Sequence, residues 1–179
     1  MQINYLDWVD QEAEFFYKEA EKRGIPCMIM EPLKGGALAS LTPDANAILE
    51  EAAPGKSIAS WAFRYVGSLP NVICVLSGMT EMEHLKDNLA TFCNFKPLDE
   101  KEKVALEKAI AEFRRYKQIG CTACRYCMPC PKGVDIPGTF AAYNRRFAEG
   151  KFWSLVDYVI CTTLRKNSTA ASNCVNCGK

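Results

Sequence analysis

The chain has 179 residues, of which 49% are apolar and 24% charged, a composition ordinary for one or two small globular domains. Its net charge of +1, without a basic block, argues against binding to nucleic acid or to an anionic membrane. It has no apolar window of about 18 residues and no signal-peptide pattern, so we expect the ten cysteines to be cytoplasmic reduced thiols or metal ligands.

Predicted strands and helices alternate through the first 118 residues. Short apolar runs predict strands at 1–6, 27–30 and 72–76. Apolar residues at helical spacing predict helices at 10–23, 44–51, from 57 onward, at 80–92 and at 99–117. The helix-capping residues that we expect are Asp10, Gly24, Ser57 and the capping box formed by Thr80 and Glu83.

This alternation is typical of right-handed parallel β/α units. Three strands are too few for a closed barrel, so we interpret them as the last three units of an eight-stranded (β/α)8 barrel. Functional loops of such barrels follow the carboxyl ends of the strands, which here are 31–36 and 77–80. The first predicted strand has no lead-in and the cysteine pattern is incomplete, so we expect a fragment of a longer protein, cut at both ends.

The character of the sequence changes after Gly120. Four cysteines follow at intervals of three, the last of them before Pro131, and a C-x-x-C pair lies near the C-terminus. Helical sequence at 138–149 and 152–164, without strand alternation, predicts an all-helical domain. The predicted domains are therefore a barrel portion at 1–118 and a metal-bound helical domain at 119–179.

Regularly spaced thiolates are typical ligands of iron–sulfur clusters. A C-x-x-C-x-x-C loop can bind three corners of a [4Fe–4S] cluster, and a cysteine before proline can ligate a second cluster. This scheme assigns Cys121, Cys124 and Cys127 to one cluster, and Cys130 to another with Cys174 and Cys177. One further ligand for each cluster is expected beyond Lys179.

A zinc site is the alternative, because two C-x-x-C pairs can also build a tetrahedral site. Cys121 and Cys124 would then act together with Cys174 and Cys177. The additional evenly spaced cysteine and the Cys-Pro step favour iron–sulfur. The remaining cysteines, for which we expect a buried packing role, are Cys27, Cys74, Cys93 and Cys161.

Several of these motifs together resemble a known family. They are MEPLKGGAL at 30–38, VLSGM at 75–79, Asn88 and CTACRYCMPCP at 121–131. Over essentially all 179 residues the chain resembles the aldo/keto reductase family, in the bacterial and archaeal subgroup that carries a C-terminal 4Fe-4S ferredoxin-type domain.

The resemblance implies a (β/α)8 barrel that binds NADP(H), less often NAD(H), across its carboxyl face. It implies that 1–6, 27–30 and 72–76 are strands six, seven and eight. Met30 would lie against the nicotinamide, and the residues lining the nicotinamide and pyrophosphate path would be Glu31, Pro32, Leu33, Gly35 and Gly36. The turn near the adenosine phosphate would be Ser77, Gly78 and Met79, and the residues meeting the adenine would be Asp87 and Asn88.

Two departures from the family pattern limit this reading. His84 stands where the family often has an arginine for the 2′-phosphate, which leaves the choice between NADP and NAD open. The catalytic tetrad belongs to the first half of the barrel, so no catalytic residue is assigned. Tyr5, Lys34 and Tyr126 match none of its roles, and we expect each to have a packing or loop role. Gly35 and Gly36 could also form only a tight turn.

Three functional hypotheses follow. In the first, the full-length protein is an oxidoreductase that couples nicotinamide chemistry on a carbonyl or alcohol substrate to 4Fe-4S electron transfer, with a redox protein as an expected partner. In the second, the chain is a non-catalytic binding module stabilised by its clusters. In the third, zinc stabilises a structural domain. In every case we expect this chain by itself to be inactive.

Overall fold

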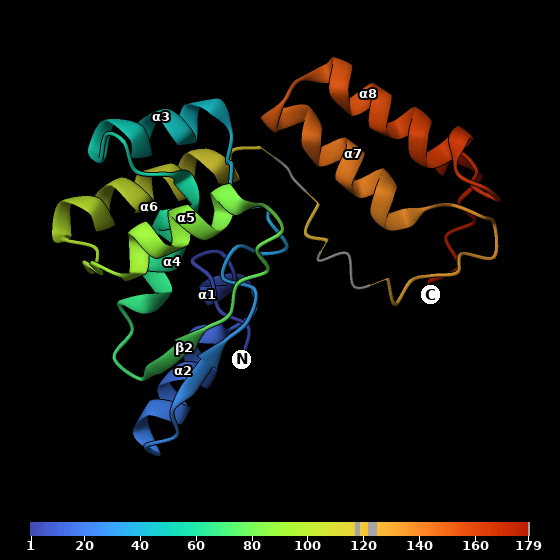
Figure 1. Cartoon of the computed structure of the whole chain (residues 1–179). Helices are drawn as coiled ribbons and strands as arrows, with labels where there is room; N and C mark the ends of the chain where they lie inside the picture. Colours follow the sequence, from blue (N-terminus) through green and yellow to red (C-terminus); the bar gives the residue numbers. More distant parts are fainter. Residues whose placement is uncertain (117–118, 122–124, 179) are drawn as a thin grey trace. The chain divides into compact units, whose positions relative to one another are not determined.

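The chain divides into two units, Met1–Phe113 and Arg114–Lys179, each described here by itself (Figure 1). The computed structural model describes residues 1–116, 119–121 and 125–178. No helix within these ranges combines the length and the apolar character that crossing a membrane requires.

The first unit contains a small parallel sheet. Strand β1 (Cys27–Ile29) pairs with β2 (Val72–Val75), with a register irregularity after Cys27. On the other side of β1, Gln2 forms a single parallel bridge with Met30. The strand predicted at 1–6 is therefore much shorter than expected. The reason is local: the Asn4 side-chain oxygen accepts hydrogen bonds from the amides of Leu6 and Asp7, and this turns the chain into a helix.

Helices cover this sheet and follow its strands. They are α1 (Asp7–Asp10), α2 (Ala13–Lys22), α3 (Pro43–Ala52), α4 (Ile58–Gly67), α5 (Met82–Phe92) and α6 (Glu100–Arg114). The helix predicted at 10–23 is broken in two, because Glu12 adopts a left-handed backbone with φ 54°. Asp10 is accordingly the last residue of α1, and the residue at the N-cap of α2 is Glu12. The predicted caps at Ser57 and Gly24 are confirmed, by a hydrogen bond from the Ser60 amide to Ser57 and by the left-handed φ of 66° at Gly24.

Two apolar clusters form the core of this unit. The first joins α3, α4 and α6 around the fully buried Trp61. The second joins the sheet to α2 and α4 through residues such as Ile29, Tyr17 and Val66. Burial of such side chains contributes roughly 1.5–3 kcal/mol each, so these clusters hold the carboxyl ends of the strands in place.

The cysteines outside the two C-x-x-C groups confirm the packing prediction in part. Cys27 and Cys161 are buried, and Cys74 is partly buried. The expectation for Cys93 is wrong: it lies at the end of α5, where its side chain is exposed.

The second unit is helical, as predicted. Its main elements are α7 (Ile136–Ala148), α8 (Lys151–Val159), a π-helical turn (Ile160–Leu164) and a 3-10 turn (Ala171–Asn173). Helices α7 and α8 lie side by side as a hairpin (Figure 1). Asp135 caps α7 by accepting a hydrogen bond from the Gly138 amide at 3.1 Å. Within the described ranges, the extended pairing of this unit is limited to one bridge between Val134 and Thr169.

A buried ion pair fixes the start of α6. Arg64, 6% exposed, donates to both carboxylate oxygens of Glu102, at 2.7 and 2.5 Å, and to the carbonyls of Lys96 and Pro97. Glu102 and Asp99 also bond reciprocally to one another's amides, which forms a capping box. The hydrogen bonds from Arg64 are the main reason that the pKa of Glu102 is lowered.

We predict that Arg64→Leu destabilises the protein strongly, because it leaves the Glu102 carboxylate and two carbonyls without their donor. The expected loss is about 3–5 kcal/mol in the free energy of unfolding, measured by urea denaturation at pH 7. Glu100→Gln is the matched control, because it removes an exposed ion pair with Lys103, and it should cost less than about 1 kcal/mol.

The same ion pair predicts how stability depends on pH. The pKa of Glu102 is lower in the folded chain than in the unfolded chain, so its contribution is complete above the unfolded value of about 4.3 and is lost as the pH falls through the folded value. In Glu102→Gln the decrease in stability between about pH 5 and pH 3 should be smaller than in the unmodified protein. Equal slopes in both proteins would contradict this assignment.

Candidate functional site

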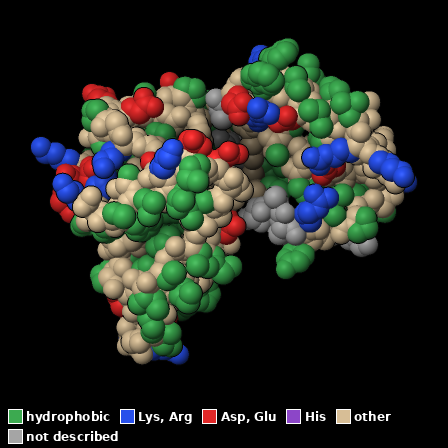
Figure 2. All heavy atoms as spheres, in the orientation of Figure 1, with side chains coloured by type: hydrophobic (Ala, Val, Ile, Leu, Met, Phe, Trp, Pro, Cys, Tyr) green, Lys and Arg blue, Asp and Glu red, His purple; other side chains and the backbone are tan. Residues whose placement is uncertain are grey.

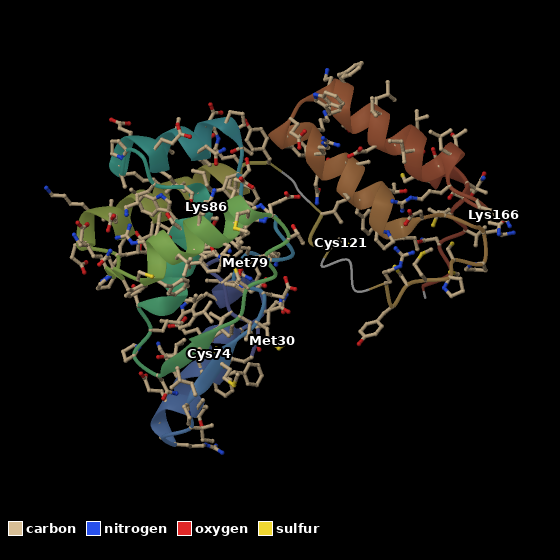
Figure 3. The ribbon with its side chains drawn as sticks, viewed as in Figure 1. Met30, Cys74, Met79, Lys86, Cys121 and Lys166 are labelled. Atoms are coloured by element: carbon tan, nitrogen blue, oxygen red, sulfur yellow. The ribbon has the colours of Figure 1, made fainter. Side chains whose placement is uncertain are left out.

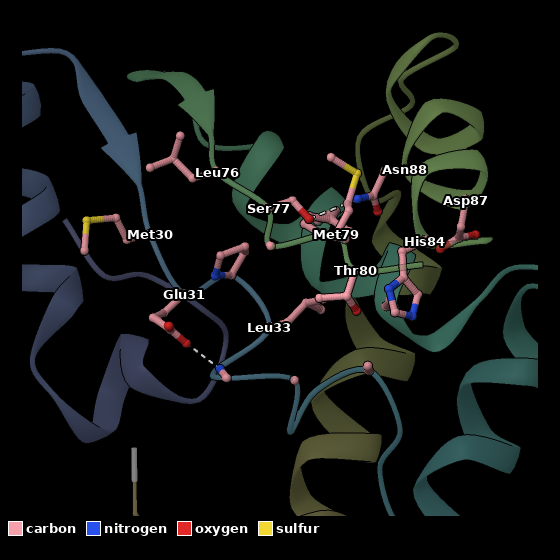
Figure 4. Close-up of a pocket in the computed structure, with 17 residues that line it drawn as sticks. Met30, Glu31, Leu33, Leu76, Ser77, Met79, Thr80, His84, Asp87 and Asn88 are labelled. Carbon is pink, nitrogen blue, oxygen red and sulfur yellow. Dashed lines mark hydrogen bonds between the residues drawn. The ribbon is translucent and has the colours of Figure 1, made fainter. Parts of the chain in front are cut away.

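A pocket of about 660 Å³ opens where the chain leaves β1 and β2 (Figure 4). All eleven residues that the sequence assigned to a dinucleotide line this one pocket. They are Met30, Glu31, Pro32, Leu33, Gly35, Gly36, Ser77, Gly78, Met79, Asp87 and Asn88. The parallel pairing of β1 and β2 brings their two loops together, because parallel strands end at the same edge of a sheet.

The pocket also contains residues that the site prediction did not include. Thr80 lines it from the loop before α5, His84 from the first turn of α5, and Leu76 from the residue after β2. Ala59 and Phe63 come from α4. The sequence predicted only a helix from residue 57 onward, and nothing local shows that one side of this helix faces a cavity.

The loop after β1 is held in an unusual backbone conformation. Glu31, Lys34, Gly35 and Gly36 all have positive φ, between 48° and 91°. This conformation is unfavourable for the two residues that carry a Cβ atom. Contacts with the rest of the unit must therefore stabilise the loop.

Asp7 provides the central contact. Its side chain is fully buried and accepts hydrogen bonds from Gln2 at 2.8 Å and from Asn4 at 2.7 Å, and it forms an ion pair with Lys34 of the loop. Burial alone would raise the pKa of Asp7, but these hydrogen bonds and the charge of Lys34 outweigh it and lower the pKa. Asn4 also donates to the Glu31 carbonyl at 3.1 Å, so two contacts join the loop to the N-terminal segment.

The glycine amides are already engaged within this loop. The Gly35 amide donates to the Glu31 carboxylate, as the dashed line in Figure 4 shows, and the Gly36 amide donates to the Leu33 carbonyl at 3.0 Å. The tight turn that we considered for Gly35 and Gly36 is therefore present. A phosphate that approached the Gly35 amide would have to compete with the carboxylate of Glu31.

The second loop is held by α5. Asn88 donates to the Ser77 hydroxyl at 3.0 Å (Figure 4). The Ser57 hydroxyl donates to Asp87 at 2.6 Å. The predicted capping box is wrong: Glu81, not Thr80, precedes α5, and no side chain caps this helix. The amides of its first turn therefore lack a side-chain acceptor, which suits an anionic ligand.

These features fit a dinucleotide. The volume lies within the usual range for ligand pockets. Apolar side chains such as Met30, Leu76 and Phe63 offer contacts to a flat ring, and the uncapped end of α5 offers donors to phosphate.

The residues that we considered as acids or bases lie elsewhere. Tyr5 is buried in the core, where burial raises its pKa, and Lys34 is engaged with Asp7. Tyr126 belongs to the second unit and is 94% exposed. None of the three lines the pocket, and its titratable lining side chains within the described ranges are Glu31, His84 and Asp87.

The cysteines of the two C-x-x-C groups are not buried where the structure describes them. Cys121, Cys127 and Cys130 are partly exposed, Cys174 and Cys177 are exposed, and Cys124 lies outside the described residues. The Asn176 amide donates to the Cys174 sulfur at 3.4 Å. In the part of the chain that the structure describes, no group of three His, Cys, Asp or Glu side chains is arranged to hold a metal ion. Thiolate chemistry suits a cluster, but the described cysteines are not gathered into one site.

Comparison with protein families gives one match, to the aldo/keto reductase family, over residues 1–111. Searches of the curated proteins and of the solved structures found no match. The parallel β/α units of the first unit fit part of the family's (β/α)8 barrel. Because the match covers more than half of the chain, the protein belongs to the aldo/keto reductase family.

Proposed function

We propose that the pocket binds NADP(H) or NAD(H), and that the protein is an oxidoreductase for small carbonyl or alcohol substrates. Family membership supports the oxidoreductase class. The observation that carries the proposal is the convergence of all eleven predicted residues on one pocket. They come from two segments about 40 residues apart in the sequence, so their convergence depends on the tertiary fold.

Each part of the pocket has a proposed role. Met30 would contact the nicotinamide, and the loop from Glu31 to Gly36 would follow the nicotinamide and the pyrophosphate. Ser77, Gly78 and Met79 would lie near the adenosine phosphate, where α5 begins. Asp87 and Asn88 would meet the adenine, and their hydrogen bonds to Ser57 and Ser77 hold both side chains in position.

When bound, the nicotinamide supplies a hydride to the carbonyl carbon, and the oxygen takes up a proton to give the alcohol. The described lining residues do not include a tyrosine or a lysine to donate that proton. We therefore assign no catalytic residue. We propose that this chain by itself binds the dinucleotide but is inactive, and that the oxidoreductase activity belongs to the full-length protein.

The second unit is proposed to carry 4Fe-4S clusters in the cytoplasm. The proposed ligands are Cys121, Cys124 and Cys127 for one cluster, and Cys130, Cys174 and Cys177 for the other. Their spacing supports this assignment, and so does the amide that donates a hydrogen bond to the Cys174 sulfur. Such clusters would supply one-electron transfer, and a redox protein is the proposed partner.

A non-catalytic binding module is the second candidate. It is favoured by the absence of a proton donor of the tyrosine or lysine type among the described pocket residues. In this case the pocket would bind a dinucleotide without any reaction, and the clusters, or a zinc ion in their place, would only stabilise the second unit.

Dinucleotide binding is tested by Gly36→Val. Gly36 has φ 91°, a backbone conformation that valine adopts only with strain, so the loop must move. We expect the Kd for NADPH, measured by fluorescence titration, to rise at least about tenfold. Gly24→Val is the matched control, because Gly24 also has positive φ but does not line the pocket. An unchanged Kd in Gly36→Val, or an equal rise in both variants, would refute the site.

The choice of cofactor is tested by His84→Arg. His84 lines the pocket beside the start of α5. An arginine there can pair with the 2′-phosphate that only NADPH carries, whereas histidine is a weaker anchor. We expect the Kd for NADPH to fall about five- to tenfold and the Kd for NADH to stay within about twofold. An equal change for both cofactors would place His84 away from the 2′-phosphate.

The metal is tested by analysis of anaerobically purified protein. Iron and sulfide, with absorbance near 400 nm, are expected for 4Fe-4S clusters, whereas zinc with a colourless protein would refute them. Cys127→Ser should remove about half of the iron, because it affects one cluster. Cys93→Ser, which changes an exposed cysteine of the first unit, should leave the iron content unchanged.

A further inference from the structure

The two units carry opposite net charges, although the net charge of the whole chain is only +1. Residues 114–179 contain eleven Lys and Arg side chains but only three Asp and Glu side chains, a net charge of +8. Residues 1–113 contain eleven basic and eighteen acidic side chains, a net charge of −7. The two values add to the net charge of the whole chain. The second unit is therefore strongly basic, which the overall composition does not reveal.

The three acidic side chains of this unit are already used. Asp135 pairs with Arg165, whereas Glu149 and Asp157 both pair with Arg145, at 2.6 and 2.7 Å. In the described part of the unit, the basic side chains with no carboxylate partner are Arg125, Lys132, Arg146, Lys151 and Lys166. Their charge is not neutralised within the unit.

Some of these charges surround the last cysteine of the C-x-x-C series. Arg125, Arg165 and Lys166 line a pocket of about 460 Å³ together with Cys130. Lys132 is exposed, and its two neighbours in the sequence, Pro131 and Gly133, also line this pocket. We call Arg125, Lys132, Arg165 and Lys166 the basic surface. With Asp135 counted against Arg165, this surface retains a net charge of +3. Figure 2 shows Lys and Arg side chains exposed on this unit, and Figure 3 labels Lys166.

The basic surface is formed by two segments that are fixed to one another. Thr169 pairs with Val134, and its hydroxyl donates to the Lys132 carbonyl at 2.7 Å. The ion pair between Arg165 and Asp135 joins the same two segments. Gly133 has φ 71°, and a Cβ atom there would lie 2.8 Å from the Asn167 carbonyl oxygen, so the segments approach too closely for any other residue. The backbone that carries these charges is therefore organised before a partner arrives, which lowers the cost of binding.

We propose that the basic surface docks an acidic protein that carries a one-electron redox centre. Charge complementarity specifies the acidic character of the partner. The inference that the partner carries a redox centre rests on the proposed function. The basic surface surrounds Cys130, and the proposed function assigns this cysteine as a cluster ligand. Tyr126, 94% exposed and next to Arg125, adds an aromatic contact. A few exposed charges around a small contact area are typical of fast, weak encounters between electron carriers.

Nucleic acid fits this surface less well. Proteins that bind single strands stack successive bases on several aromatic side chains inside a basic groove. In the two described segments, 125–133 and 165–169, Tyr126 is the only aromatic residue. The basic side chains also surround a compact pocket and do not form a continuous track.

The test uses the intact 179-residue protein and a small acidic [2Fe–2S] ferredoxin, with binding measured by calorimetry in 50 and 300 mM NaCl. Lys132→Glu/Lys166→Glu should weaken binding at least about tenfold in 50 mM NaCl, and 300 mM NaCl should weaken binding of the unmodified protein similarly. The matched control is Arg146→Glu/Lys151→Glu. It changes the net charge by the same amount at the other end of the α7–α8 hairpin, about 20 Å away by helix length. Its binding should stay within about threefold.

Three results would overturn the proposal. They are no binding of the ferredoxin by the unmodified protein, equal weakening in both double variants, and tighter binding of a single-stranded RNA 12-mer through Lys132 and Lys166. Circular dichroism confirms that each variant is folded. Binding is measured without turnover and without dinucleotide, so a failure of NADPH binding would refute the proposed function while leaving the docking result intact.

Discussion

The buried carboxylate of Asp7 is the interaction on which the pocket of the first unit depends. A fully buried charge is unfavourable unless it is paired and hydrogen-bonded, and Asp7 satisfies this requirement with donors from Gln2, Asn4 and Lys34. Two of these donors lie in the N-terminal segment and the third lies in the loop after β1. Satisfying one carboxylate therefore fixes the loop to the segment beside it. Removing one partner of such a pair costs about 3–5 kcal/mol, which is comparable to the strain of the two left-handed residues Glu31 and Lys34, about 1–3 kcal/mol each.

On the other side of the pocket, too, one side chain joins two elements. Ser57 caps α4 with its hydroxyl oxygen and donates the hydroxyl proton to Asp87 on α5. One side chain thus sets the start of one helix and the position of a pocket residue on the next. Asn88, one residue later, holds Ser77 of the loop after β2. The pocket is therefore built from contacts between elements, and the two loops depend on helices that are distant in sequence.

The limits of prediction follow from the range of the interactions concerned. The strands at 27–30 and 72–76 were predictable because an apolar run between turn residues is a local signal. The helix at 10–23 was predicted as one piece because Asp10 is a good N-cap for the apolar spacing that begins at Ala13. Its break follows from the Asn4 turn and the short helix α1, which start a new direction before α2 begins. Cys93 was expected to be buried because helix position alone does not define which side of α5 faces solvent.

By itself, the sequence determined which residues follow the carboxyl ends of the strands, the family, and the regular cysteine spacing of the second unit. These properties depend on neighbouring residues and on spacing along the chain. Only the tertiary structure decided that Lys34 pairs with Asp7, 27 residues away, and that the Gly35 amide is already taken by Glu31. It also placed Lys166 and Cys130 in the lining of one pocket. The reason is physical: burial and ion pairing act between groups that meet only when the chain has folded.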